Sequence, residues 1–240
     1  MIFDAIEHSS ARIIELFTNS YAPPVSYNQS AAVLADIMPI LQGVQFPLQM
    51  RFKVLTLAPT VRIIDVTGRV ILVVRQKLFK FKEHVEIFSD EARQQKVAEI
   101  RADQIIDWSA QYHFTEPNGK AIGSTKRKGM KSLWRASYDV FNPRDTVPNF
   151  EIRETNPWAK FVDGVVGSLP LIGLLSLYFF HPSYGATRLT GGQVTMKMTK
   201  QPAFLEGRFL VEKLATATDR ETFNLILSFF MLCLLERRRG

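Results

Sequence analysis

The residues that could carry catalytic chemistry are scattered along this sequence. None of its four histidines, His8, His84, His113 and His181, has a second histidine at the spacing of a metal-binding HxH or HxxxH pair. The single cysteine, Cys233, excludes an internal disulfide and a cysteine-based zinc site. We therefore expect no catalytic residue, no metal-ligand set and no cofactor.

Common motifs for nucleophiles and phosphates are also missing. No serine stands in a GxSxG sequence, and no GxGxxG or P-loop pattern occurs. The carboxylates Asp103 and Asp107 lie in RADQIIDW, which is typical of a turn or short helix with a solvated face. The sequence therefore predicts a protein that is not an enzyme, and binding functions remain.

A basic cluster is the first candidate binding site. Five cations occur within ten residues of TKRKGMKSLWR, and they are Lys126, Arg127, Lys128, Lys131 and Arg135. Such a cluster predicts contact with anionic phospholipid head groups, worth about 1 kcal/mol per basic residue at an anionic surface. The alternative is a solvated hairpin tip that only keeps the protein soluble.

An apolar segment is the second candidate. The seventeen residues from Gly164 to Phe180 carry no charge. As one helix they would span about 26 Å, slightly less than the ~30 Å hydrocarbon core of a bilayer, and Pro170 favours two shorter helices. The residues predicted to dock on a membrane or a protein partner are Trp158, Leu171, Ile172, Leu174, Leu175, Leu177, Tyr178, Phe179 and Phe180. The alternative is that this segment covers one mouth of a barrel and is buried.

The net charge of +7 is unevenly distributed along the chain. Residues 1–45 carry −3, so the remainder carries +10, which suits an anionic membrane surface or nucleic acid. Trp134, Tyr138 and Phe141 alternate with polar residues, as core-facing strand residues do, which argues against base stacking and nucleic-acid binding. The N-terminal residues lack a positive region followed by an apolar run, so no signal peptide is expected and the cytoplasm is the default location.

Short strands must position both candidate sites. From about Phe46, β-branched or alternating runs follow one another; they are RFKVLTL, VRIIDVT, RVILVVRQ, HVEIF, KVAEIRA, SAQYHF, KAIGST, KSLWRASYDV, NFEIRE, QVTMKMTK and RFLVEKL. The pattern IIDVTGRVI returns in YHFTEPNGKAIG and more weakly in RLTGGQVTM, with 51 residues from Gly68 to Gly119 and 73 from Gly119 to Gly192. Ten to twelve strands with tight hairpins predict one antiparallel barrel or sandwich.

The end of the chain, TFNLILSFFMLCLLERRRG, predicts a buried helix. Thr218 and Glu221 form a capping box, and no charge occurs from Thr222 to Leu235. Those fourteen residues would span only about 21 Å, too little for a bilayer, and a helix that is apolar on all faces must be buried. The residues predicted to fill the barrel core are Phe223, Leu225, Ile226, Leu227, Phe229, Phe230, Leu232 and Leu234.

The order of these parts resembles the superfamily of LURP-one-related proteins, phospholipid scramblases and the tubby C-terminal domain, and most closely its LURP-one-like branch. The resemblance rests on the repeated strand–Gly–strand units, the strand KSLWRASYDV and the pair RFLVEKL and DRETFNLILSFFMLCLLE. It implies an all-β fold, a closed antiparallel twelve-stranded β-barrel around a central hydrophobic C-terminal helix. The sequence lacks a cysteine-rich segment and an acidic loop with calcium-ligand spacing before the last helix, so calcium-triggered scrambling is not implied.

The predicted organisation is a helical appendage over 1–45 and a barrel domain over 46–240, with an insertion at 156–182 and the central helix at 219–236. The leading functional hypothesis is a non-enzymatic module that binds membrane phospholipids peripherally, at the inner membrane face. A soluble protein-interaction or scaffold domain is one alternative, and its partner is another protein or a second copy of this chain. Scramblase-like lipid translocation is another.

Overall fold

The computed structural model describes residues 38–53, 60–75, 84–103, 110–128, 137–155, 182–203 and 206–237. The chain divides into two compact units, Met1–Met38 and Pro39–Gly240, and the following description concerns the second. The predicted helical appendage and most of the predicted insertion stay predictions, because residues 1–37 and 156–181 lie outside the described part of the chain.

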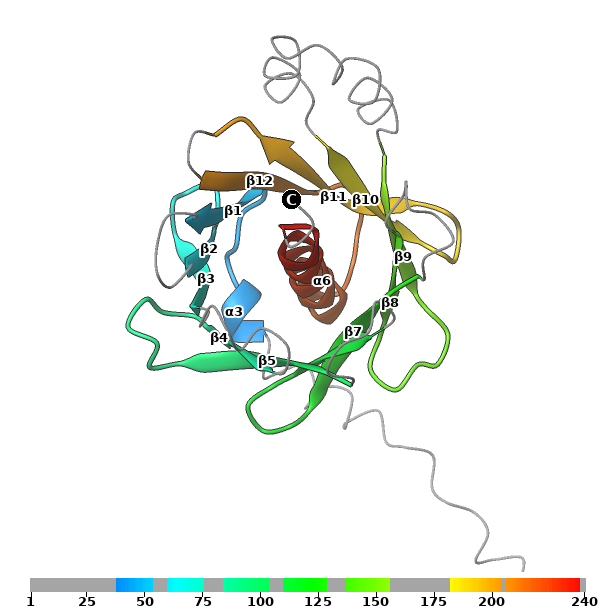
Figure 1. The fold of residues 1–240 in the computed structure, drawn as a ribbon, viewed down its shortest axis with the longest axis horizontal. Coiled ribbons are helices and arrows are strands. Elements are labelled where there is room, and N and C mark those ends of the chain that lie inside the picture. Colours follow the sequence, from blue (N-terminus) through cyan, green and yellow to red (C-terminus); the bar gives the residue numbers. More distant parts are fainter. Residues whose placement is uncertain are drawn as a thin grey trace, which may run out of the picture. The chain divides into compact units, whose positions relative to one another are not determined.

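Twelve antiparallel strands close into one barrel around a single long helix (Figure 1). The strands are β1 (Leu48–Lys53), β2 (Thr60–Ile64), β3 (Val70–Arg75), β4 (His84–Phe88), β5 (Lys96–Ala102), β6 (Gln111–Thr115), β7 (Ala121–Arg127), β8 (Ser137–Phe141), β9 (Phe150–Glu154), β10 (Ser183–Arg188), β11 (Val194–Gln201) and β12 (Glu206–Lys213). Each strand pairs with its neighbours in the chain, and β1 pairs with β12 to close the sheet. The described helices are α3 (Met38–Leu41) and α6 (Asp219–Arg237).

The predicted fold class is confirmed, including the central position of the C-terminal helix. Closure gives every strand a paired neighbour on both sides, and α6 fills an interior that is too wide for strand side chains alone. The strand missing from the sequence prediction is β10, whose SYGATR carries no branched apolar residue. Its small residues fit a crowded position, since a Cβ on Gly185 would lie 2.9 Å from Cγ2 of Thr155.

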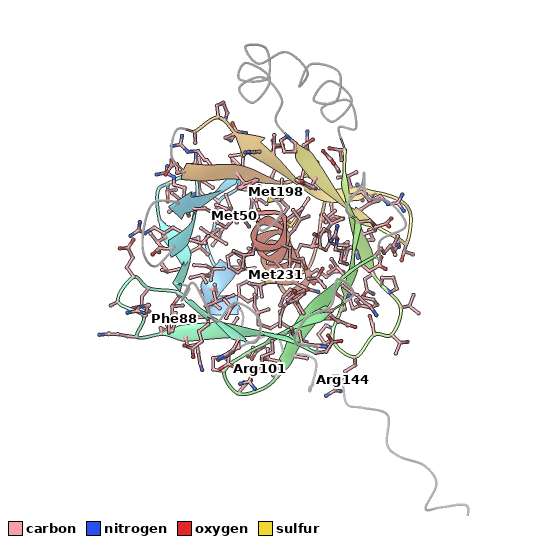
Figure 2. The ribbon with its side chains drawn as sticks, viewed as in Figure 1. Met50, Phe88, Arg101, Arg144, Met198 and Met231 are labelled. Atoms are coloured by element: carbon pink, nitrogen blue, oxygen red, sulfur yellow. The ribbon has the colours of Figure 1, made fainter. Side chains whose placement is uncertain are left out.

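Alternation of side chains separates the core from the outer wall. Along β2 the buried Val61 and Ile63 face the interior, while Arg62 between them faces outward. The interior is aromatic and sulfur-rich around α6, as Figure 2 shows for Met50, Met198 and Met231.

The connections alternate between the two ends of the barrel, because each strand runs opposite to the one before it. We call the end at which α6 begins the helix-entry end and the other the opposite end. The helix-entry end carries 65–69, 89–95, 116–120, 142–149, 189–193 and the segment 214–218 that leads into α6. The opposite end receives the connections 54–59, 76–83, 103–110, 128–136, 155–182 and 202–205.

The internal repeat corresponds to hairpins at the helix-entry end. In β2–β3 the N–H of Asp65 donates to the carbonyl of Arg69, and in β6–β7 the N–H of Glu116 donates to that of Lys120. The turn glycines Gly68 and Gly119 have φ of 86° and 84°, and the pairing shifts by one residue just before each turn. Hairpin β10–β11 closes in the same way through Arg188 and Gln193. The three copies therefore recur every four strands around the barrel.

Candidate functional site

The helix α6 fills the interior of the barrel. All eight residues predicted to form the core are at most 4% exposed, which confirms the central helix. Phe230 stacks on Phe52 of β1 with ring centroids 6.4 Å apart, and Sγ of Cys233 lies 3.5 Å from Sδ of Met198 on β11. The interior is thus a packed protein core, and among the described helices none is both long and apolar enough to cross a membrane.

A buried asparagine sets the position of α6 against β7 and β8. Asn224 is fully buried, and its Nδ2 donates to the backbone carbonyl of Phe141 at 2.9 Å. Gly123 on β7 makes room for it, because a Cβ there would lie 2.2 Å from that same nitrogen. The sequence does not indicate that these two residues meet. Asn224 is a polar residue within an apolar run, and Gly123 is a single glycine within a strand.

Two ion pairs of opposite polarity hold the first turn of α6. Both oxygens of Glu221 accept from Arg188, at 2.7 and 3.1 Å, and Arg188 stacks over Phe150 at 4.6 Å. The adjacent Arg220 lies 3.7 Å from buried Glu116. Glu116 and Arg188 hold equivalent positions in two copies of the repeated hairpin. The two hairpins therefore present opposite charges, which pair with Arg220 and Glu221 of the helix.

The predicted capping box is formed, and Glu221 serves both the cap and the ion pair. The N–H of Glu221 donates to Oγ1 of Thr218 at 3.2 Å, and the N–H of Thr218 donates back to Oε2 at 3.0 Å. Burial alone would raise the pKa of Glu221, but Arg188 and Thr218 hold the pKa of this carboxyl below its ordinary value. The start of α6 is therefore fixed by charge as well as by packing.

Three residues of the predicted head-group cluster are described, and they differ in their surroundings. Lys126 is exposed on the outer face of β7. Arg127 pairs in register with buried Tyr138 and so lies on the interior side of the strand. Lys128 is 46% exposed, but its Nζ contacts Asp139 at 3.0 Å and Glu151 at 2.8 Å. Lys131 and Arg135 lie outside the described residues.

Glu151 is the centre of a polar cluster on the outer wall that spacing in the sequence did not reveal. Besides Lys128, it accepts a hydrogen bond from Oγ of Ser137 and pairs with Arg153, each at 2.8 Å. Burial would raise the pKa of Glu151, yet these donors hold it below its ordinary value. The pKa of Lys128 is raised in turn, chiefly by its hydrogen bond to the Glu151 carboxylate and then by Asp139. This part of the predicted cluster is internally neutralised.

A second such centre is Glu99 on β5. It accepts from Lys96 and Arg101 and contacts Nε2 of His84 at 3.0 Å, and these hydrogen bonds, led by that of Lys96, lower its pKa to about 2. His84, Glu86 and Glu99 bring potential ligand atoms within 4.8 Å of one another, although the sequence showed no such neighbour for His84. Lys96 contacts both carboxylates and acts as their counter-ion.

The nine predicted docking residues, Trp158, Leu171, Ile172, Leu174, Leu175, Leu177, Tyr178, Phe179 and Phe180, all lie outside the described residues. The strands that flank them are described, however. β9 ends at Glu154 and β10 begins at Ser183, so both ends of the apolar connection lie at the opposite end of the barrel. The basic connection between β7 and β8 leaves from this same end, one hairpin away. The two candidate segments are therefore joined to one barrel end.

Exposed apolar side chains of the described residues concentrate at the helix-entry end. They are Val66, Val147, Leu189, Val194 and Leu214, between 37% and 70% exposed. Each lies in a hairpin turn, at the start of β11 or just after β12.

Comparison with known proteins locates the chain among similar sequences. Residues 70–166, which contain β3 to β9, match the profile of the LURP-one-related family. An X-ray structure of a protein from Arabidopsis thaliana is similar at 14% sequence identity, with a TM-score of 0.46, covering 82% of this chain and 94% of that one. No curated protein sequence matches this chain. The profile match confirms the resemblance of this chain to the LURP-one-related family.

Proposed function

We propose that this protein is a non-enzymatic, cytoplasmic module that binds anionic phospholipid membranes peripherally through the opposite end of its barrel. The observation that carries the proposal is the contrast between the two sets of connections. Those at the opposite end contain seven basic and four acidic residues, a net charge of +3, whereas those at the helix-entry end carry −1. The helix α6 runs away from the helix-entry end and ends at Arg237, and Arg238 and Arg239 follow it in the sequence.

Aromatic residues show the same contrast. All three tryptophans of the chain, Trp108, Trp134 and Trp158, belong to connections at the opposite end, and the connections at the helix-entry end contain none. Tryptophan with nearby lysine and arginine is the composition that favours the membrane–water interface. The combination supports contact of this end with an anionic bilayer.

Vesicle flotation with charge-reversed variants tests the proposal. We expect the full chain to float with vesicles that contain phosphatidylserine at low salt. The double variant Lys131→Glu, Arg135→Glu should lose about tenfold or more in affinity, since each reversed charge removes roughly 1 kcal/mol of attraction and adds repulsion. Deletion of residues 165–180 should also weaken binding.

The matched control reverses two charges at the helix-entry end, Lys120→Glu and Arg144→Glu. It changes the net charge of the protein equally, so it should retain flotation if the contact is local. Equal losses in both double variants would show a nonspecific charge effect. Absence of flotation in the wild type would refute the proposal.

A protein-interaction function is a second candidate, and the exposed apolar side chains of the helix-entry end favour it. Leu189 and Leu214 are about half exposed there. If a partner docks on this end, Leu189→Ser with Leu214→Ser should abolish the association and leave flotation intact. Light scattering at increasing concentration tests self-association first.

A further inference from the structure

Three arginines stand side by side on the outer wall of the barrel. Arg51 of β1 pairs in register with Arg208 of β12 on one side and with Arg62 of β2 on the other. Directly opposed residues on neighbouring strands have Cβ atoms about 4.5–5.5 Å apart, so the row places three guanidinium groups across about 10 Å. Gln201 on β11 and Val73 on β3 end this arginine row.

The outer arginines of the row have acidic partners, and the central one has a neutral partner. Arg62 pairs with Glu91 at 2.8 Å, and Arg208 pairs with Glu206 on its own strand. Arg51 donates two hydrogen bonds to Oε1 of Gln49, from Nε at 3.0 Å and from Nη2 at 2.7 Å. Three cations and two carboxylates leave an excess positive charge, centred on Arg51.

This arrangement has no evident structural benefit. The core side chains Met50 and Phe52 on either side of Arg51 face the interior, whereas Arg51 faces outward. Like charges directly opposite each other on paired strands are destabilising, and Arg51 has such a neighbour on both sides. An uncharged residue at position 51 would relieve the repulsion, so Arg51 adds concentrated charge to the outer wall rather than stability.

We propose that the arginine row binds a phosphate group, with Arg51 as its central contact. A guanidinium binds oxyanions through parallel N–H donors, and several guanidiniums offer more donors than the two oxygens of one carboxylate can accept. A phosphate group has more acceptor oxygens and carries up to two charges, which matches a row of three cations. Gln49 orients the Arg51 guanidinium through its Nε edge.

This inference does not rest on the proposed membrane function, because none of the three arginines belongs to a connection at the opposite end. The phosphate can come from a lipid head group or from a small soluble compound. Both sources present the same chemistry to Arg51, and vesicle binding separates them.

Thermal unfolding of the full chain in phosphate and in chloride, at equal ionic strength, tests the proposal. Phosphate should raise the Tm of the wild type. Arg51→Gln should have an unchanged or higher Tm in chloride, because a repulsion is removed, and should lose the rise in phosphate. In a titration with inorganic pyrophosphate, Arg51→Gln should bind about tenfold or more weakly than the wild type, which is the usual effect of losing hydrogen bonds to a charged group.

Arg153→Gln is the matched control. Arg153 also lies on the outer wall and is 67% exposed, but its cross-strand neighbours are Ser137 and Gly185 and it pairs with Glu151. This variant should keep the phosphate effect. Flotation with phosphatidic acid vesicles then identifies the source: loss in Arg51→Gln indicates a lipid phosphate, and equal flotation of wild type and variant indicates a soluble compound.

Three results would overturn the proposal. The first is a wild-type Tm that does not respond to phosphate. The second is an Arg51→Gln variant that keeps the phosphate effect as Arg153→Gln does. The third is an Arg51→Gln variant that unfolds or loses stability in chloride, which would show that Arg51 has a structural role.

Discussion

Asn224 of α6 packs against Gly123 of β7, where a side chain on the strand would have no room. Gly123→Ala should destabilise the fold by about 2–3 kcal/mol, because a Cβ would lie 2.2 Å from Nδ2 of a side chain that is fully buried. Asn224→Ala should also destabilise, since the carbonyl of Phe141 would lose its donor. Urea denaturation measures both losses.

The double variant distinguishes a steric contact from two independent defects. Asn224→Ala removes the atoms that the new methyl group would strike, so the combined loss should be well below the sum of the single losses. Additive losses would contradict the proposed contact.

Glu99 makes the stability of the protein dependent on pH in the acidic range. Its pKa is about 2 in the folded protein, below the ordinary value of 4.5, so the stabilisation is present above about pH 4.5 and is lost as the pH falls toward 2. We expect Glu99→Gln to lower stability at pH 7 by about 1–2 kcal/mol after allowance for solvent screening, and to flatten the fall below pH 4.5. Denaturation at pH 7, 4 and 3 measures this. An unchanged acid profile in the variant would contradict it.

The residues that form these sites were hard to recognise in the sequence for a physical reason. Glu99 and Glu151 each combine partners on their own strand with partners from outside it, and the register of the sheet brings His84 to Glu99 and Ser137 to Glu151. Lys128 appeared in the sequence as a member of a basic cluster, yet its closest partners are Asp139 and Glu151. A run of charged residues in the sequence does not show which residues of the neighbouring strands lie beside it.

At the scale of elements, α6 is the part of the fold that could be predicted best. The capping box at Thr218 and the uncharged run from Thr222 to Leu235 are local signals, and burial on all faces follows from them. Strand β10 has no such signal, because its central residues Gly185 and Ala186 are small. A Cβ on Gly185 would lie 2.9 Å from Cγ2 of Thr155, so the neighbouring segment limits the size of the residue at that position. Local patterns therefore predict an element when its own side chains stabilise it.

Removal of α6 should unfold the barrel. Ten of its apolar side chains are at most 4% exposed, and their burial contributes roughly 10 kcal/mol or more, comparable with the whole stability of a domain. A chain that ends at Thr218 should lose near-ultraviolet circular dichroism and cooperative thermal unfolding. A chain that lacks only 238–240 should keep both. A folded barrel without α6 would contradict the central role of the helix.

At the scale of the whole molecule, the alternating direction of the strands sorts the connections into two chemically different groups. The short turns at the helix-entry end hold the start of α6 through Glu116 and Arg188. We therefore expect membrane binding at the opposite end, whose connections do not hold the start of α6. The sequence contained both candidate segments, but only the topology shows that the connections 128–136 and 155–182 leave from one end.

The distribution of tryptophan makes this orientation measurable without labels. Because Trp108, Trp134 and Trp158 all belong to connections at the opposite end, intrinsic emission should report contact of that end with lipid. We expect vesicles with brominated acyl chains to quench the emission of the bound wild type more strongly than unbrominated vesicles. A variant with these three residues changed to phenylalanine and with Leu189→Trp places the only tryptophan at the helix-entry end. It should bind without such quenching, and strong quenching of this variant would mean that the protein meets the bilayer with its other end.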